Sequence, residues 1–472
     1  MKFSKSLFYI IAAFAISSLF VACSKDDDDD GGNNQTTKVE LVGNLTTRTL
    51  TADKKYLIKG QVFVGNGQTL TIEPGTVIFG DKATRGTLII DKGGKIIAEG
   101  TKDKPIVFTS ALDPGVRDRG DWGGIVILGR ANVNQVNPAV EGITPEANFG
   151  TTNSTEFDNE SSGVLKYVRV EFAGIELTPN NETNSITLGG IGRGTVVEYC
   201  QVSFGGDDGF EWFGGTVNCK YLISSATWDD DFDVDYGYAG NVQFGLALRY
   251  PGFADQSQSN GFETDNGPND NDVQPYTNGV FSNITILGPI LEGTKVSNGN
   301  FGHGIDLRRR TALSVANSFV GGFPKGVRMN QASVLGQFQN EVGVLFNNIL
   351  WAASSSDAFV AGSGVNKDDV EAYWNSNKNK TKIEAFSPDG YRAYGINPDL
   401  LYGKQLPDQY PSNPNFTLTS GGTLSNGADF SHSKFSEPNR SGFFQNVPFI
   451  GAVGSEDWTD GWAEFNPITR EY

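Results

Sequence analysis

Tyr199-Cys-Gln-Val202 is one copy of a four-residue frame that recurs through the middle of the chain and decides its fold. The other copies are Tyr167-Val-Arg-Val170, Asn218-Cys-Lys-Tyr221, Asn241-Val-Gln-Phe244, Asn283-Ile-Thr-Ile286, Asn317-Ser-Phe-Val320 and Asn348-Ile-Leu-Trp351. Their second positions lie 32, 19, 23, 42, 34 and 31 residues apart. A constant strand frame with irregular intervals predicts a coiled ribbon whose turns carry loops of varied length on one side.

Shorter apolar runs such as Leu70-Thr-Ile72 and Leu88-Ile-Ile90 begin the series, and few helical segments interrupt it. The pattern resembles the right-handed parallel β-helix, in which each coil buries its apolar face only by stacking on the next. We therefore expect an all-β, single-stranded parallel β-helix (a solenoid) over residues 38–396. One short amphipathic helix is expected at 366–375, inside a loop. A β-sandwich array is the alternative, but the one-sided loops argue against it.

Residues 397–472 are rich in Pro and Asn and end in Asp457-Trp-Thr-Asp-Gly-Trp462-Ala-Glu-Phe465. A solenoid must cover its open ends, because unpaired strands there aggregate. We predict that this region is an aromatic cap that plugs the open end. Ligand binding by Trp458 and Trp462 is the alternative.

The first residues have the order of a secretory signal: Lys2 and Lys5, an apolar run over 7–20, and small residues before Cys23. Val-Ala-Cys23 resembles the lipobox of bacterial lipoproteins, which implies a signal peptide over 1–22 and acylation of Cys23. The Ser-Lys-Asp-Asp that follows resembles the surface-export signal of Bacteroidota lipoproteins. Residues 23–37 then read as an acidic, self-repelling tether. We expect a lipid anchor in the outer membrane with the body exposed at the cell surface; an ordinary cleaved signal is the alternative.

Composition excludes several functions. The 472-residue chain has 55 acidic and 37 basic residues and a formal net charge of −18, which disfavours nucleic acid as a partner. No phosphate-binding glycine loop leads from a strand into a helix, so nucleotide use is not indicated. With only two histidines, a zinc site or a Ser-His-Asp triad has little support.

Two cysteines remain beside Cys23. The frame places Cys200 and Cys219 in register on neighbouring coils, about 4.8 Å apart. They form either a disulfide or two stacked interior thiols, and the geometry of adjacent parallel strands favours the thiols slightly.

A second repeat lies between these strands and carries most of the charge. Its copies are Asp208-Gly-Phe210-Glu-Trp-Phe213, Asp230-Asp-Phe232-Asp-Val-Asp235, Asn260-Gly-Phe262-Glu-Thr-Asp265, His303-Gly-Ile305-Asp-Leu-Arg308 and Lys325-Gly-Val327-Arg-Met-Asn330. If the copies are equivalent strands, the apolar third positions point inward and the flanking positions form outward columns. One column is Glu211, Asp233, Glu263, Asp306 and Arg328; it begins acidic and ends basic.

Stacked carboxylates need an explanation, since two of them at strand spacing repel by about 3–4 kcal/mol at an effective dielectric near 20. They bind a cation, take up protons, or splay into solvent. Calcium prefers such oxygen ligands, and a carboxylate pair with separated pKa values also suits glycoside hydrolysis. The candidate calcium ligands are Asp208, Glu211, Asp230, Asp233, Asp235, Glu263 and Asp265. A solvated acidic face, a cation site and a catalytic groove all remain open.

Part of this pattern resembles the polygalacturonase family of parallel β-helix hydrolases, on Asp207-Asp208, Asp229-Asp230-Asp231 and Gly302-His303-Gly304. The resemblance implies Asp208 or Asp230 as the catalytic acid, with His303 supporting the groove. The family's Asn-Thr-Asp is absent, and Arg308-Arg-Arg310 only loosely echoes its Arg-x-Lys. Polysaccharide lyases of the same fold use calcium with a Lys or Arg base, a role that Lys325 or Arg328 would fill.

As a whole the chain resembles a group of Bacteroidota surface lipoproteins with β-helix bodies, on Asp-Asp-Gly-Phe-Glu at 207–211 and the closing Asp-Trp-x-x-Gly-Trp. We predict a binding or accessory module that presents its acidic face to a glycan or to a surface or outer-membrane protein, with calcium as the candidate ion. Glu211, Trp212, Lys325 and Arg328 are the candidate binding residues. The alternative is a calcium-assisted hydrolase or lyase acting on an acidic polysaccharide.

Overall fold

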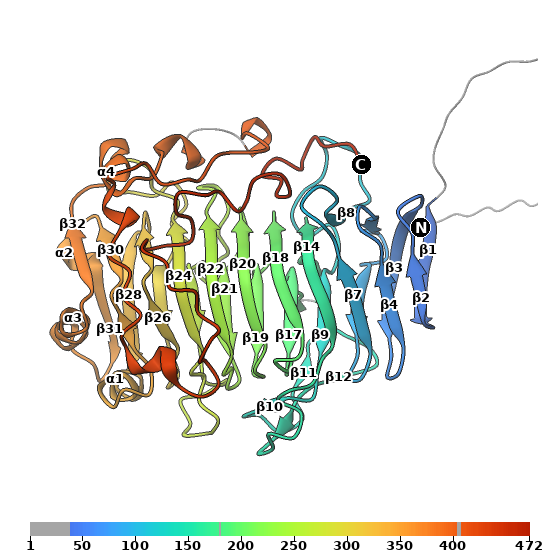
Figure 1. Cartoon of the computed structure of the whole chain (residues 1–472), viewed down its shortest axis with the longest axis horizontal. Helices are drawn as coiled ribbons and strands as arrows, with labels where there is room; N and C mark the ends of the chain where they lie inside the picture. The colour runs from blue at the N-terminus through green and yellow to red at the C-terminus, as the bar shows by residue number, and fades with distance from the viewer. Residues whose placement is uncertain (1–37, 179–180, 404–406) are drawn as a thin grey trace, which may run out of the picture. The chain divides into compact units, whose positions relative to one another are not determined.

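Strands dominate the computed structural model, which describes residues 38–178, 181–403 and 407–472. Within the unit Lys38–Tyr472, 26 of the described strands join in one sheet whose pairings are parallel (Figure 1). Strands pair with the equivalent strands of the coils before and after them, as in a parallel β-helix, and the predicted fold class is confirmed. The predicted signal peptide, Cys23 and the tether lie outside the described residues.

Each coil passes through three faces, and on each face the segments of successive coils lie side by side. Face 1 contains β2 (Arg48–Leu50), β4 (Thr69–Ile72), β7 (Lys95–Glu99), β26 (Ser314–Ala316), β29 (Leu345–Phe346) and the first halves of β14 (Gly163–Glu171), β18 (Val196–Ser203), β20 (Asn218–Ser225), β22 (Asn241–Leu248) and β24 (Val280–Leu287). Face 2 contains the second halves of these five strands with β5 (Val77–Gly80), β8 (Ile106–Ser110), β27 (Phe319–Gly321), β30 (Ile349–Ala352) and β32 (Lys380–Ile383).

Face 3 carries the acidic repeat. It contains β6 (Thr87–Ile90), β9 (Ile125–Leu128), β17 (Ile186–Gly189), β19 (Phe210–Phe213), β21 (Phe232–Asp235), β23 (Phe262–Thr264), β25 (His303–Leu307), β28 (Lys325–Gln331) and β31 (Phe359–Ser363). The first strands, β1 (Val39–Leu45) and β3 (Lys55–Val64), each span faces 2 and 3.

From β14 onward, the bend between faces 1 and 2 is made by one residue in the left-handed region on each coil. These residues are Tyr167, Tyr199, Tyr221, Phe244, Asn283, Asn317 and Asn347, with φ between 50° and 67°. That conformation is costly for a residue with a Cβ, and contacts between coils offset the cost. The four rings stack at centroid distances of 4.4, 4.3 and 5.0 Å, and the Asn347 amide donates to Asn317 Oδ1 at 2.7 Å.

This bend corrects the predicted register of the two cysteines. Cys200 pairs with Leu222 and Cys219 pairs with Val197, so the two are offset by three residues and not stacked. The bend residue equivalent to Tyr199 is Tyr221 and not Asn218, and the sequence frame fitted both. Both thiols are buried and free, as the slight preference for thiols expected, and burial raises the pKa of Cys219 to about 12.

Loops leave the coil at the other two corners, between faces 2 and 3 and between faces 3 and 1. The sequence predicted loops on one side only. The loops hold three small pairings: β10 (Asn132–Val133) with β13 (Thr151–Thr152), β11 (Ala139–Val140) with β12 (Ala147–Asn148), and β15 (Glu176–Thr178) with β16 (Asn181–Glu182). Among the described residues, none of the helices is long and apolar enough to cross a bilayer.

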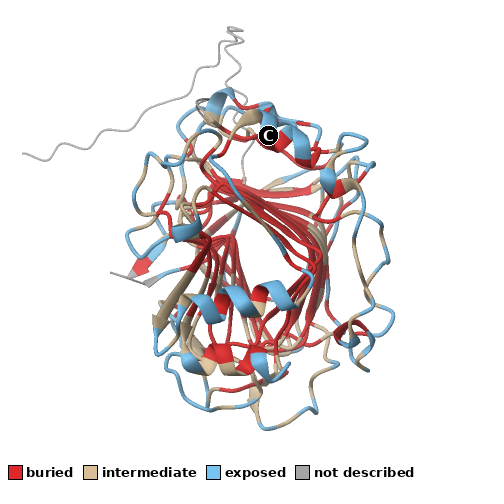
Figure 2. Cartoon of the chain, turned by 90° about the vertical axis from the view of Figure 1, so that its left-hand side faces the viewer, coloured by how far each residue is buried: buried red, intermediate tan, exposed pale blue. Residues whose placement is uncertain are grey.

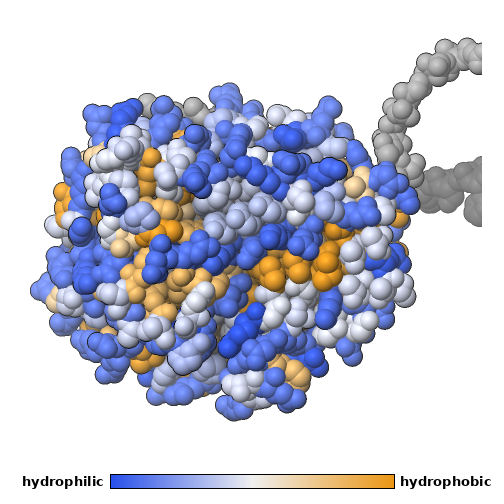
Figure 3. Space-filling view, viewed as in Figure 1, coloured by the Kyte–Doolittle hydropathy of each residue, from blue (hydrophilic) through white to orange (hydrophobic). Residues whose placement is uncertain are grey.

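The C-terminal region does not plug the open end as predicted. It runs along the flank of the coils and continues the core there, with Trp462 and Phe465 buried beside Phe204 and Ile223. It runs opposite to the order of the coils. Its first residues contact late coils, where the Asn347 amide donates to the Gly427 carbonyl, and its last residues contact early coils, where the Gln201 amide donates to the Glu464 carbonyl. We call residues 427–472 the strap. Figure 3 shows hydrophobic patches between hydrophilic residues on the face that it crosses.

Helices cover the end of the solenoid instead. Their bounds are α1 (Ala332–Gln339), α2 (Ser355–Ala358), α3 (Lys367–Ser376) and α4 (Pro388–Tyr394), and short 3-10 turns span Pro398–Leu400, Pro407–Gln409, Thr423–Ser425 and Ser433–Ser436. Phe338 of α1 and Trp374 of α3 insert into the main core, and Figure 2 shows helices with their buried sides toward the coil. The helix predicted at 366–375 is α3.

Candidate functional site

The acidic columns of face 3 have the register that the sequence predicts. Phe210 pairs with Phe232, Phe232 with Phe262, and Phe262 with Ile305, and all four side chains are buried in the main core. Because side chains alternate along a strand, the next residue of each strand points away from the core. The outward column is therefore Glu211, Asp233, Glu263, Asp306 and Arg328.

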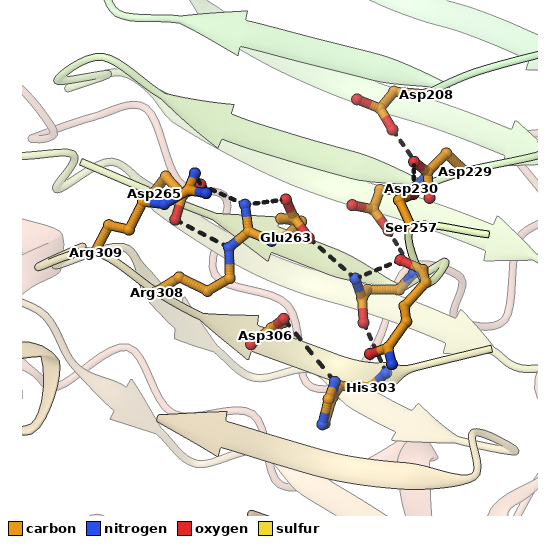
Figure 4. A network of polar contacts seen from close by, with 12 residues as sticks. Asp208, Asp229, Asp230, Ser257, Glu263, Asp265, His303, Asp306, Arg308 and Arg309 are labelled. Atoms are coloured by element: carbon orange, nitrogen blue, oxygen red, sulfur yellow. Dashed lines mark hydrogen bonds and ion pairs between the residues drawn. The ribbon is translucent and has the colours of Figure 1, made fainter. Parts of the chain in front are cut away.

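A second column holds the coils together at the entry to these strands. Asp208 Oδ1 accepts the backbone N–H of Asp230 at 2.8 Å, Asp230 accepts that of Asn260, and Asn260 Oδ1 accepts that of His303 at 2.7 Å (Figure 4). One oxygen of each aspartate is thus fixed by the next coil. The side chains of this column are almost fully buried.

The two columns bring carboxylates together in three overlapping groups, which we call the acidic cluster. The groups are Asp207, Asp208 and Asp229; Asp208, Glu211 and Asp233; and Asp230, Asp233 and Glu263. In each group one oxygen per residue lies within 4.8 Å of the others. Asp229 and Asp233 each have one buried oxygen without a hydrogen-bond partner among the described residues.

Arginines pair mainly with the carboxylates of the later coils, and in the coil of Asp230 the buried Arg249 pairs with Asp231 at 3.3 Å. Arg308 binds both Glu263 and Asp265, Arg309 binds Asp265 at 2.5 Å, and Arg328 binds Asp306. Among the described residues, no Lys or Arg forms an ion pair with the cluster members of the earlier coils, Asp207, Asp208, Glu211, Asp230 and Asp233. The Glu211 carboxylate has a neutral partner, because it accepts a hydrogen bond from the Asn184 amide.

Burial and mutual repulsion disfavour the charged form of these carboxylates. Burial, and then the neighbouring carboxylates, raises the pKa of Asp207, Asp208, Glu211, Asp230 and Asp233 well above the usual range. Burial likewise raises the pKa of Asp235 to about 8 and, against the opposing charge of Arg308, that of Glu263 to about 8. A divalent cation would supply the charge that the earlier coils lack and satisfy the unpartnered oxygens.

The remaining predicted residues lie beside the cluster and differ in their partners and burial. Asp235 and Asp265 stand two residues after Asp233 and Glu263 of the outward column, and Asp265 is bound by two arginines. His303 is fully buried and 3.9 Å from Asp306, and burial with the charges of Arg328 and Lys325 lowers its pKa to about 2. It is held as a neutral imidazole.

Trp212 was expected to bind a ligand, and this prediction is wrong. It follows Glu211 on β19, so strand alternation turns it into the core, where it is fully buried against Phe232 and Phe281. Lys325 follows His303 on the second column, whereas Arg328 ends the outward column and is already paired with Asp306.

Three residues of the site were not predicted as ligands. Asp207 and Asp229 directly precede the predicted aspartates and complete the first group of the cluster. Asn184 stands two residues before Ile186, which pairs with Phe210. It therefore occupies the position of Asp208 one coil earlier, and extending the repeat to Asn184-Ser-Ile186 would have found it.

Comparisons with known proteins agree with this architecture. A family model described as a pectate-lyase-like β-helix domain matches residues 43–387, which includes all three faces and the acidic cluster. The searches of curated proteins and of solved structures gave no match. The chain belongs to the pectate-lyase-like β-helix family.

Proposed function

We propose that the protein is a glycan-binding β-helix protein whose acidic cluster holds a divalent cation, and that this cation bridges to an anionic sugar. The observation that carries the proposal is the acidic cluster on the earlier coils, in which Glu263 alone forms an ion pair with a basic side chain among the described residues. Calcium fits best, because it accepts six to eight oxygen ligands in flexible geometry. Asp207, Asp229, Asp233 and Glu263 are partly exposed, so a sugar carboxylate can reach an ion held there.

Binding is favoured over catalysis by the state of the basic residues. A lyase needs a Lys or Arg free to take a proton, and Arg308, Arg309 and Arg328 are each bound to carboxylates. Of the two candidate bases, this leaves Lys325, which forms no ion pair within the described part of the chain. Asp208 and Asp230, the candidate acids, already hold backbone N–H groups of the next coil. A calcium-assisted hydrolase or lyase is the second candidate, supported by the fold, which is typical of carbohydrate-active proteins.

Calcium titration of metal-free protein tests the cation site. We expect saturable binding and a rise in melting temperature. Glu211→Gln should lower the calcium affinity at least tenfold and make the rise in melting temperature smaller. Glu371→Gln is the matched control, because Glu371 is exposed on α3. No calcium response in the native protein, or an equal response in both variants, would overturn the site.

Polyuronates then test the ligand. Binding of a polyuronate with calcium, and its loss with a chelator, supports the proposal, whereas calcium-independent binding contradicts the bridging role. New reducing or unsaturated ends in the same incubations would identify an enzyme instead.

We also propose that acylated Cys23 anchors the β-helix on the outer surface of the outer membrane. The support is the N-terminal sequence alone, Val-Ala-Cys23 followed by Ser-Lys-Asp-Asp. Metabolic labelling with palmitate and protease treatment of whole cells test this, with Cys23→Ala expected to abolish both labelling and membrane retention. A labelled protein that resists external protease in intact cells would overturn surface exposure.

A further inference from the structure

A cavity lies on the opposite side of face 2 from the acidic cluster, where the strap crosses the ring stack at the bend. It has a volume of about 300 Å³, at the lower end of the range for small-ligand sites. Its lining includes Tyr221 and Phe244 of the stack and strap residues Phe449 and Trp458.

Trp458 is one of the residues that line this cavity. Trp462 stacks on Trp458 at 6.5 Å with an interplanar angle of 21°, and Trp462 does not line the cavity. Tyr221 meets Trp458 edge to face at 5.3 Å and also lines the cavity, so the indole borders the cavity between the strap and the ring stack. The Trp458 Nε1 donates to the Ala452 carbonyl at 2.9 Å, which fixes the orientation of the ring.

Polar groups line the rim. The exposed carboxylate of Glu456 and the side chain of Gln445 border the cavity, and the Tyr221 hydroxyl donates to Gln445 Oε1 at 3.4 Å. An aromatic face takes up C–H groups, while the rim oxygens accept hydrogen bonds from hydroxyls. A pyranose ring presents both kinds of group, and the Glu456 charge disfavours an anionic sugar.

We propose that this cavity binds one neutral pyranose unit of a glycan, stacked on Trp458 and hydrogen-bonded to Glu456. The site is independent of the cation of the acidic cluster and would add a second contact to the same or another glycan. Two contacts on one body increase avidity when a chain can reach both.

Calorimetric titration with neutral oligosaccharides (xylo-, cello-, manno- and galacto-series) in the presence of a chelator tests the proposal. We expect saturable binding by at least one series, weakened at least tenfold by Trp458→Ala, less by Trp458→Phe, and three- to tenfold by Glu456→Ala. Glu456 is exposed, so its variant reports on binding without disturbing the strap. Tyr276→Ala, at a partly exposed aromatic residue in another loop, is the control and should bind normally.

Absence of binding across the panel, or equal binding by all variants, would overturn the proposal. Binding of an aromatic or proline-rich peptide that Trp458→Ala abolishes, without glycan binding, would assign the cavity to a protein partner and equally overturn it. The chelator separates this result from the calcium-dependent polyuronate test, so each site can fail alone.

Discussion

Aspartate 233 shows at the scale of single residues why the acidic cluster is unusual. It neighbours Glu211 and Glu263 on adjacent coils, and one of its oxygens is buried without a partner among the described residues. Repulsion of about 3–4 kcal/mol between two charges 4.8 Å apart exceeds what one typical hydrogen bond returns. The native chain therefore tolerates this column by protonation or by binding a cation.

Asp233→Asn should separate these two effects. In metal-free protein at pH 8 we expect a higher melting temperature than in the native chain, because one repelling charge is removed. The rise in melting temperature caused by calcium should shrink in the same variant. Scanning calorimetry with and without calcium measures both, and Asp103→Asn, at an exposed turn, should change neither. A lower metal-free melting temperature would contradict the repulsion argument.

His303 gives a pH dependence with a defined sign. Its folded pKa of about 2 lies below the value of 6.5 expected when unfolded. Below pH 6.5 the unfolded chain binds a proton that the folded chain excludes, so stability is present above pH 6.5 and lost as the pH falls.

Urea unfolding at pH 7, 6 and 5 should show this loss as a difference between the native chain and His303→Gln. The native free energy of unfolding should fall more steeply, by up to about 1.4 kcal/mol per pH unit. Parallel pH profiles for the native chain and His303→Gln would show that folding does not lower the pKa of His303.

At the scale of strands, the bend between faces 1 and 2 joins each coil to its neighbour and to the strap. Asn317 illustrates how one side chain serves three purposes there. It adopts φ 50°, its amide donates to the Asp429 carbonyl at 3.0 Å, and its Oδ1 accepts from Asn347 and from the Asp429 N–H. The bend, the next coil and the strap are all joined at this residue.

Replacing Asn317 with Ala or Gly should separate conformation from hydrogen bonding. Both variants lose the side-chain bonds and leave buried groups unpaired, which costs about 1–3 kcal/mol for each group. Ala also places a Cβ in the left-handed region, so we expect it to be about 1 kcal/mol less stable than Gly. Denaturant titration measures the difference, and equal stabilities would show that the bend carries no strain.

The sequence predicted the register of face 3 but not that of the bend, for a physical reason. On face 3 the apolar and charged positions alternate, so a one-residue slip would turn Glu211 into the apolar core and Phe210 out of it. At the bend, Asn218 and Tyr221 are both polar or aromatic residues before a small or apolar one, and either fits the frame. Only the left-handed conformation of Tyr221 selects it, and a frame of residue types does not encode φ.

At the scale of the whole described unit, the strap connects coils that are far apart in the sequence. The sequence predicted the aromatic character of the strap but not its course. Its contacts join residues hundreds of positions apart, such as Gln201 with Glu464, and no periodic pattern records such a pairing. Burial of Trp462 against Tyr167 and Tyr199 is the centre of this contact.

Trp462→Ala should therefore act as a core substitution, although it lies outside the coils. We expect a loss of about 3–5 kcal/mol in the free energy of unfolding, from lost burial and the cavity left behind. Urea titration measures it, with Val136→Ala as a control at a side chain that is 78% exposed. A loss below 1 kcal/mol would mean that the strap is only loosely attached.

The last residue, Tyr472, returns to the first coils, where its backbone oxygen accepts from Lys55 and its hydroxyl donates to Glu171. Arg117 holds the Arg470 carbonyl at 2.7 Å in the same way. In most repeat proteins each unit senses only its neighbours, and terminal units can fray while the centre stays intact. Here the end of the strap is tied to the first coils, so fraying of those coils must first release the strap. We expect a single cooperative thermal transition, in contrast to the stepwise melting of an untethered array.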